Sequence, residues 1–134
     1  MKKFDLQGVE ILANYREAFN FISKPQNLTK WTQAFKSADD TTAELQTPQG
    51  VATIKLKTSL SESTGTIDWH MEFADGSKGS AFSRLIELEQ GLVLYSFTLL
   101  APPVPLEILE GTLMQQSKTL AQELQNLKKM LEKG

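Results

Sequence analysis

The feature that most constrains the fold is a stripe of leucines at helical spacing near the C-terminus. Its members recur at intervals of three and four, with one interruption at Ser117: Leu106, Leu109, Leu113, Leu120, Leu124, Leu127 and Leu131. This spacing places them on one face of a helix of about 28 residues, which is about 40 Å long at a rise of 1.5 Å per residue. A helix of that length needs an equally wide apolar surface to cover its leucine face.

The middle of the chain has a different hydrophobic period. From about residue 41 to residue 100, apolar and polar residues alternate, most clearly over residues 67–73. Turn signals at Pro48–Gly50, Asp75–Gly76 and Gln90–Gly91 separate the alternating runs. Together with a first strand over about residues 5–13, these runs predict about six antiparallel strands with one buried face.

Two short helices are predicted between the first strand and the later ones. Asn14 is a good N-cap, with Glu17 three residues on, and predicts a helix to about Ser23. A second helix, over about residues 26–35, would carry three apolar side chains on one face: Leu28, Trp31 and Phe35. The fold class predicted is α+β: a curved antiparallel sheet wrapped around a long C-terminal helix, as a single domain over residues 1–134.

Composition excludes several classes of function. The chain has 134 residues, 40% hydrophobic and 22% charged, which is typical of a globular domain. Its net charge is -2 and its lysines are scattered, so we expect no nucleic-acid binding. Cysteine is absent and His70 is the single histidine, which excludes thiolate chemistry and multi-histidine metal sites. We therefore expect no metal and no cofactor.

The chain also lacks the usual signs of export or membrane insertion. The first residues have a basic start, but Asp5, Gln7 and Glu10 interrupt any apolar core of a signal peptide. The most apolar stretch, residues 92–109, contains three prolines and cannot cross a bilayer as one helix. We expect a cytoplasmic protein without membrane insertion.

Two segments resemble a known family. Residues 11–19 read Ile-Leu-Ala-Asn-Tyr-Arg-Glu-Ala-Phe, and residues 25–31 read Pro-Gln-Asn-Leu-Thr-Lys-Trp. With the order of elements, they resemble the START/Bet v 1-like (SRPBCC) superfamily, in particular its polyketide cyclase-like proteins. Asn14 stands where the family has Pro, Ala18 where it has Val, and Lys24 where it has Asp. The resemblance implies a helix-grip fold; its members range from lipid carriers to cyclases and chaperone co-regulators, so it does not fix a function.

A groove between the sheet and the long helix is the predicted site. Its predicted lining is Trp31, Phe35, Ile54, Leu56, Trp69, Met71, Phe82, Arg84, Tyr95, Phe97, Leu109, Leu113 and Ser117. Arg84 shares a strand face with Phe82 and is therefore expected inside, where a charge needs a partner. That partner is either Glu107 or Glu110 of the long helix or a ligand carboxylate.

The remaining polar candidates are weaker. Tyr95 shares a face with Phe97, so its hydroxyl either orients a ligand or reaches the rim of the core. His70 alternates with Trp69 and Met71 and is expected on the outer, solvated face. No convincing catalytic set follows from the sequence.

Three functions remain open from the sequence. The leading hypothesis is binding of a small apolar or amphipathic molecule in the groove. The alternatives are a cofactor-free cyclase or dehydratase that uses Arg84, Tyr95 and water, and a protein-partner module without a cavity. A hollow with converging polar groups would favour catalysis, an apolar hollow would favour binding, and a closed core would favour the partner role.

Overall fold

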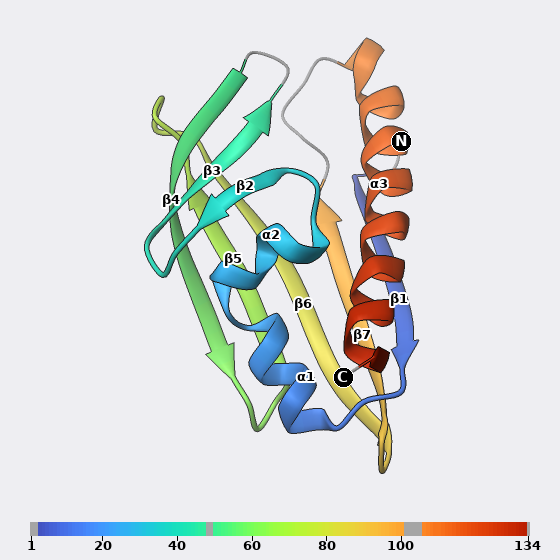
Figure 1. Cartoon of the computed structure of the whole chain (residues 1–134). Coiled ribbons are helices and arrows are strands. Elements are labelled where there is room, and N and C mark those ends of the chain that lie inside the picture. Colours follow the sequence, from blue (N-terminus) through green and yellow to red (C-terminus); the bar gives the residue numbers. More distant parts are fainter. Residues whose placement is uncertain (1–2, 48–49, 101–105, 134) are drawn as a thin grey trace.

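A curved antiparallel sheet and a long C-terminal helix form the fold in a computed structural model (Figure 1). The structure describes residues 3–47, 50–100 and 106–133, with side chains in the last segment from residue 114 onward. Within these residues the sheet has seven strands in the order β1-β7-β6-β5-β4-β3-β2, so the first strand pairs with the last. The described elements are β1 (Phe4–Ile11), α1 (Tyr15–Ile22), η1 (Pro25–Asn27), α2 (Leu28–Trp31), β2 (Phe35–Ala38), β3 (Thr42–Thr47), β4 (Gly50–Ser61), β5 (Thr66–Glu72), β6 (Lys78–Glu89), β7 (Leu92–Leu100) and α3 (Leu106–Lys133).

The short helices follow β1 as predicted, but the second is shorter than predicted. Asn14 caps α1 by accepting a hydrogen bond from the Glu17 N–H at 3.1 Å. α2 ends at Trp31 because Thr32 turns to extended backbone while its hydroxyl donates to the Leu28 carbonyl at 2.6 Å. Phe35, predicted in that helix, instead begins β2. This strand is the one that the prediction of about six strands lacked.

The long helix is anchored to the sheet and to the short helices. Leu120, Leu124 and Leu127 are buried, which confirms this part of the leucine stripe. The side chains of Leu106, Leu109 and Leu113 lie outside the described residues. α3 lies along β1 at one side of the sheet and also contacts α2 (Figure 1). Two residues after the end of α2, the Gln33 N–H donates to the Glu123 carboxylate at 2.6 Å.

The interruption of the stripe at Ser117 has a structural explanation. The Gln7 side-chain amide on β1 donates to the Ser117 carbonyl at 2.8 Å and lies 3.1 Å from the Ser117 hydroxyl. A small residue in α3 therefore makes room for a polar side chain of the edge strand.

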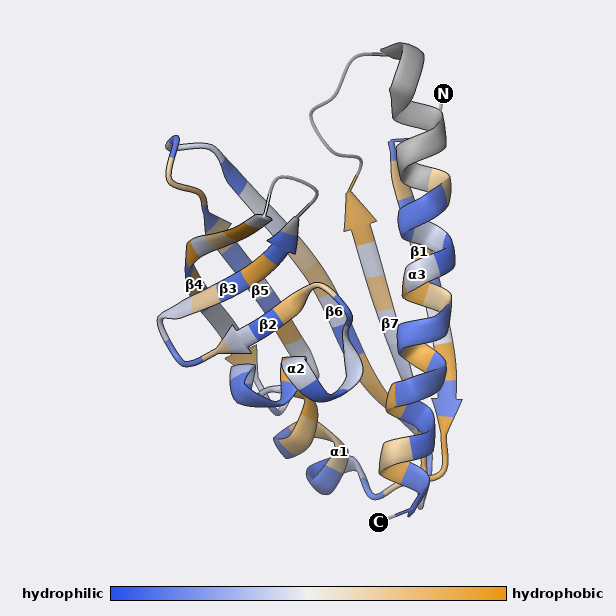
Figure 2. Ribbon diagram, turned by 45° about the horizontal axis from the view of Figure 1, so that its top comes forward, coloured by the Kyte–Doolittle hydropathy of each residue, from blue (hydrophilic) through white to orange (hydrophobic). Residues whose placement is uncertain are grey.

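The two faces of β6 are the reverse of the prediction. Ala81, Ser83 and Leu85 are buried, whereas Arg84 and Ile86 are exposed on the opposite face with the half-buried Phe82. The sequence favoured the other phase because Phe, Ile and Leu outweigh Ala and Ser as apolar residues. The structure buries the smaller set because large rings from β5 and β7 fill the space above them. Figure 2 shows hydrophilic and hydrophobic residues intermixed along the strands of the sheet. A search for membrane-spanning helices among the described residues finds none with the required length and hydropathy.

Candidate functional site

A row of aromatic rings lines the inner face of the sheet. The Trp31 ring of α2 meets Tyr95 of β7 edge-on, with centroids 6.3 Å apart and planes at 85°. Tyr95 is followed by Phe97 at 6.5 Å, and Phe97 by Trp69 of β5 at 6.0 Å. Trp31, Trp69 and Tyr95 are almost fully buried. Three separate elements thus place their rings in one continuous group.

Small residues on β6 make this row possible. β6 lies between β5 and β7, and it places Ala81 opposite Trp69 and Ser83 opposite Phe97. Because neither side chain is large, the Trp69 ring reaches across β6 to contact Phe97. The shape of the inner surface therefore depends on the small side chains of β6 as well as on the large rings of β5 and β7.

Aliphatic side chains continue the same surface toward β4. Ile54 and Leu56 are buried, and Phe35, Met71 and Phe97 are half-buried against the same core. With Trp31, Trp69 and Tyr95, most of the predicted groove residues face one interior.

Several hydrogen-bonding side-chain atoms in the described part of the chain are buried without a partner, most of them in this interior. They are Trp31 Nε1, Thr58 Oγ1, Trp69 Nε1, Tyr95 OH and Gln116 Oε1. An unpaired buried donor or acceptor costs about 1–3 kcal/mol, so native proteins rarely leave one without a reason. Such atoms among aromatic rings are typical of a site whose remaining hydrogen bonds come from a bound molecule or from water.

Tyr95 is the most enclosed of these groups. Desolvation by burial raises the pKa of Tyr95 far above its usual range, and the neighbouring Ser83 hydroxyl offsets only part of this. The Ser83 hydroxyl donates its hydrogen to the Ile67 carbonyl, and the Tyr95 hydroxyl has no hydrogen-bond partner among the described residues. The tyrosine is therefore a neutral hydrogen-bond donor across the physiological pH range.

Arg84 and Phe82 are not part of this interior, contrary to prediction. The Arg84 side chain is 46% exposed on the outer face, where its Nη1 lies 2.8 Å from Asp68 Oδ1. Among the described residues its partner is Asp68, and the side chains of the two predicted glutamates lie outside the described residues. Phe82 lies on the same outer face, with its ring 6.2 Å from that of His70.

The remaining three predicted site residues, all on α3, are Ser117, Leu109 and Leu113. Ser117 is half-buried and engaged with Gln7. The side chains of Leu109 and Leu113 lie outside the described residues. Conversely, the sequence reasoning missed Ser83 and Thr58, and the only available signal was a small polar residue in an otherwise alternating strand.

His70 lies on the outer face, as predicted, but it is half-buried rather than exposed. Its Nδ1 is 2.9 Å from the Ser80 hydroxyl, and the Phe82 ring lies against it. Among the described residues no cluster of three His, Cys, Asp or Glu side chains could hold a metal.

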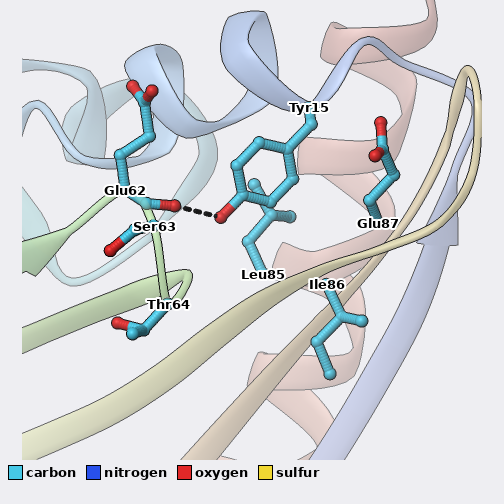
Figure 3. A pocket seen from close by; sticks show the side chains of 7 residues that line it. All are labelled: Tyr15, Glu62, Ser63, Thr64, Leu85, Ile86 and Glu87. Carbon is cyan, nitrogen blue, oxygen red and sulfur yellow. Dashed lines mark hydrogen bonds between the residues drawn. The ribbon is translucent and has the colours of Figure 1, made fainter.

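A separate hollow lies on the surface between α1, the β4–β5 turn and β6. It has a volume of about 430 Å³ and is lined by Tyr15, Glu62, Ser63, Thr64, Leu85, Ile86 and Glu87. Figure 3 shows the Tyr15 ring between the two glutamates, with its hydroxyl donating to the Glu62 carbonyl at 2.6 Å. None of the predicted groove residues lines this hollow, so it is distinct from the interior site.

Comparison with known proteins identifies the architecture. No protein-family model and no curated protein matches the sequence. Among solved structures, a START superfamily protein from Mycobacterium smegmatis superimposes with a TM-score of 0.67 at 15% identity, covering 98% of this chain and 99% of that one. The chain has the START/Bet v 1-like fold.

Other proteins with this fold show how widely it is used. The Aha1 dimer from Colwellia psychrerythraea has a TM-score of 0.68 at 16% identity, covering 98% of this chain and 97% of that one. The di-domain ARO/CYC protein BexL from the BE-7585A biosynthetic pathway has a TM-score of 0.71 at 11% identity, covering 95% of this chain and 45% of that one. At such identities the START/Bet v 1-like fold is shared, and function has to be argued from the interior site.

Proposed function

We propose that the protein binds a small, uncharged, largely apolar molecule between the sheet and α3. The observation that carries this proposal is the set of unpaired polar atoms among buried aromatic rings: Trp31 Nε1, Trp69 Nε1, Thr58 Oγ1 and Tyr95 OH. A ligand with a mostly apolar body and one or two polar atoms would pack against the aromatic rings and supply hydrogen-bond partners for these unpaired atoms. The START/Bet v 1-like fold, with its sheet curved over a helix, is consistent with such a role.

The outward position of Arg84 narrows the ligand class. A guanidinium inside the groove would have selected a carboxylate or phosphate head group, but this one pairs with Asp68 on the outer face. Without Arg84, the catalytic set considered for a cyclase is also not assembled. Binding is therefore the function that the arrangement supports best.

Intrinsic fluorescence tests the proposal directly, because both tryptophans of the chain belong to the site. Titration with the neutral apolar dye N-phenyl-1-naphthylamine should quench their emission and increase that of the dye, with one molecule bound and a Kd in the micromolar range, about -8 kcal/mol. Native mass spectrometry of protein purified from its own host would show any co-purified molecule.

A pair of neighbouring variants distinguishes the interior from the outer face. Ala81→Leu adds bulk beneath Trp69 and Phe97 and should abolish dye binding, whereas Phe82→Leu changes the outer face and should leave it intact. Circular dichroism would verify that both variants fold. Dye binding that survives in Ala81→Leu, or that is absent from the wild type, would exclude an interior ligand site.

A further inference from the structure

Near Tyr95, hydrogen bonds from side chains supplement the backbone pairing of β5 with β6. In this pairing Thr66 lies opposite Arg84, and Trp69 lies opposite Ala81. Between these pairs, Ser83 donates its backbone N–H to Asp68 Oδ1 at 3.1 Å, and its hydroxyl donates to the Ile67 carbonyl. One residue of β6 is thus bound both to an outer-face carboxylate and to the backbone of β5.

This arrangement fixes the direction of the Ser83 hydroxyl hydrogen. Ser83 is 2% exposed and lies on β6 two residues before Leu85, which is paired with Tyr95. Because its hydrogen is committed to Ile67, Ser83 is not available as a donor inside the site. The Tyr95 hydroxyl is fully buried and has no partner among the described residues, so it retains a hydrogen that it can donate.

We propose that the Tyr95 hydroxyl is the polar recognition point of the interior and donates to a neutral carbonyl oxygen of the ligand, with Ser83 and Asp68 as positioning residues. The inference rests on the proposed function and names its ligand class. A purely hydrocarbon ligand would leave the hydroxyl unpaired, which is costly in a buried site.

Charge explains why the acceptor should be a neutral one. Asp68 is 8% exposed, and its carboxylate is close enough to act electrostatically on Tyr95. The cation that balances it, Arg84, lies on the outer face of the sheet and not in the groove. Among the described residues, no buried cation would therefore accompany an anionic group at Tyr95, and burying a charge without one is costly. A ketone, ester or amide oxygen carries no net charge to be balanced.

Two probes of nearly equal shape test this recognition. 2-Acetylnaphthalene carries a ketone where 2-ethylnaphthalene has only a hydrocarbon group, and quenching of Trp31 and Trp69 reports the Kd of each. The wild type should bind the ketone about tenfold more tightly, as expected for one well-formed hydrogen bond in a buried site. Tyr95→Phe should bring this ratio close to one and leave the affinity for the hydrocarbon unchanged.

Variants of Asp68 separate positioning from general stability. Asp68→Asn keeps an acceptor for the Ser83 N–H, so it should keep the ketone preference; removal of the charge should also improve binding of 2-naphthoate. Asp68→Ala frees Ser83 from this contact and should reduce the preference. A merely structural role would weaken both naphthalenes equally and leave their ratio unchanged.

The outcomes distinguish this inference from the proposed function. If the wild type binds neither probe, the ligand-binding function itself is wrong. If it binds both with a ratio near one, or if Tyr95→Phe keeps the preference, the protein binds ligands but Tyr95 is not the recognition point. Tighter binding of 2-naphthoate than of the ketone by the wild type would overturn the neutral ligand class.

Discussion

At the scale of single residues, Asp68 is notable because its carboxylate is nearly buried on the outer face of the sheet. It accepts hydrogen bonds from the Ser83 N–H and from Arg84, at 3.1 and 2.8 Å. A carboxylate with so little access to water depends on these donors, since desolvation penalises its charge. The Asp68–Arg84 pair should therefore stabilise the packing of β5 against β6 more than an exposed surface ion pair would.

Replacing Arg84 with Met should lower the free energy of unfolding by about 1–2 kcal/mol at pH 7, because Asp68 then keeps the Ser83 N–H as its one hydrogen-bond donor among the described residues. Arg16→Met is a matched control: Arg16 and Glu62 are 3.9 Å apart, with side chains 78% and 47% exposed. Loss of such an exposed pair should cost less than about 0.5 kcal/mol. Urea unfolding of both variants measures the difference, and equal costs would contradict the role given to Asp68.

The sequence could not have placed Arg84 correctly. Each face of β6 carries apolar residues, and the side chains of the neighbouring strands decide which face is buried. Only the pairing of Ala81 with Trp69 and of Ser83 with Phe97 shows that small residues belong inside. For the same reason, the unpaired Tyr95 hydroxyl could be considered from sequence but not established.

At the scale of elements, α3 is held to the rest of the fold by its buried leucines. Leu120 is 4% exposed, whereas Met114, on the same helix, is 55% exposed. Leu120→Ala should lower the free energy of unfolding by about 2–5 kcal/mol, as is usual for a buried leucine. Met114→Ala should change it by less than about 0.5 kcal/mol. A small effect of Leu120→Ala in thermal or urea unfolding would show that α3 is only loosely attached.

Two glutamates of α3 should affect stability in opposite directions as pH changes. Burial raises the pKa of Glu123, and the hydrogen bond from the Gln33 N–H opposes this only in part. Hydrogen bonds from the Leu12 N–H and from Lys128 lower the pKa of Glu132. The contribution of Glu123 is therefore full below its unfolded pKa of about 4.3 and is lost as pH rises through the folded value. That of Glu132 is present above about 4.3 and is lost as pH falls through its folded value.

Glutamine variants test these signs, because glutamine keeps an acceptor without the charge. At pH 7, Glu123→Gln should raise the unfolding midpoint relative to the wild type, and Glu132→Gln should lower it. Both differences should shrink as the pH approaches 4. Unfolding curves at several pH values measure this, and a shift of the same sign in both variants would refute the assignment.

Most elements could be predicted because their hydrophobic periods are long and regular. The stripe of α3 and the alternation of β5 are such cases. β2 was missed because Leu28, Trp31 and Phe35 fit helical spacing, although the chain becomes extended at Thr32. A local interaction, the Thr32 hydroxyl with the Leu28 carbonyl, decides the helix end and has no periodic signature.

At the scale of the whole molecule, the sheet brings the two ends of a long segment together. β1 pairs with β7 from Phe4 opposite Leu100 to Ile11 opposite Val93. Folding must therefore close a loop of most of the chain before this ladder forms. Topologies with such non-local pairing fold in milliseconds to seconds, in contrast to helical bundles.

Stopped-flow refolding should show this slow range, with Trp31 and Trp69 as reporters of the interior. Val9→Ala in β1 should mainly speed unfolding if the pairing of β1 with β7 forms late. Refolding within microseconds, or a refolding rate that falls as strongly as stability in Val9→Ala, would indicate that β1 joins early.

The contacts between the end of α3 and β1 also bear on how copies of the protein behave toward one another. β1 is the last strand on its side of the described sheet, and Lys128 donates to the Glu10 carbonyl at 2.8 Å while Glu132 accepts from the Leu12 N–H at 2.9 Å. These backbone groups would otherwise be free to pair with an extended segment of another chain. The end of α3 thus occupies backbone groups at one end of the edge strand β1. Another chain cannot add a strand there, so aggregation through this part of the sheet edge is blocked, while the inner face of the sheet stays unchanged.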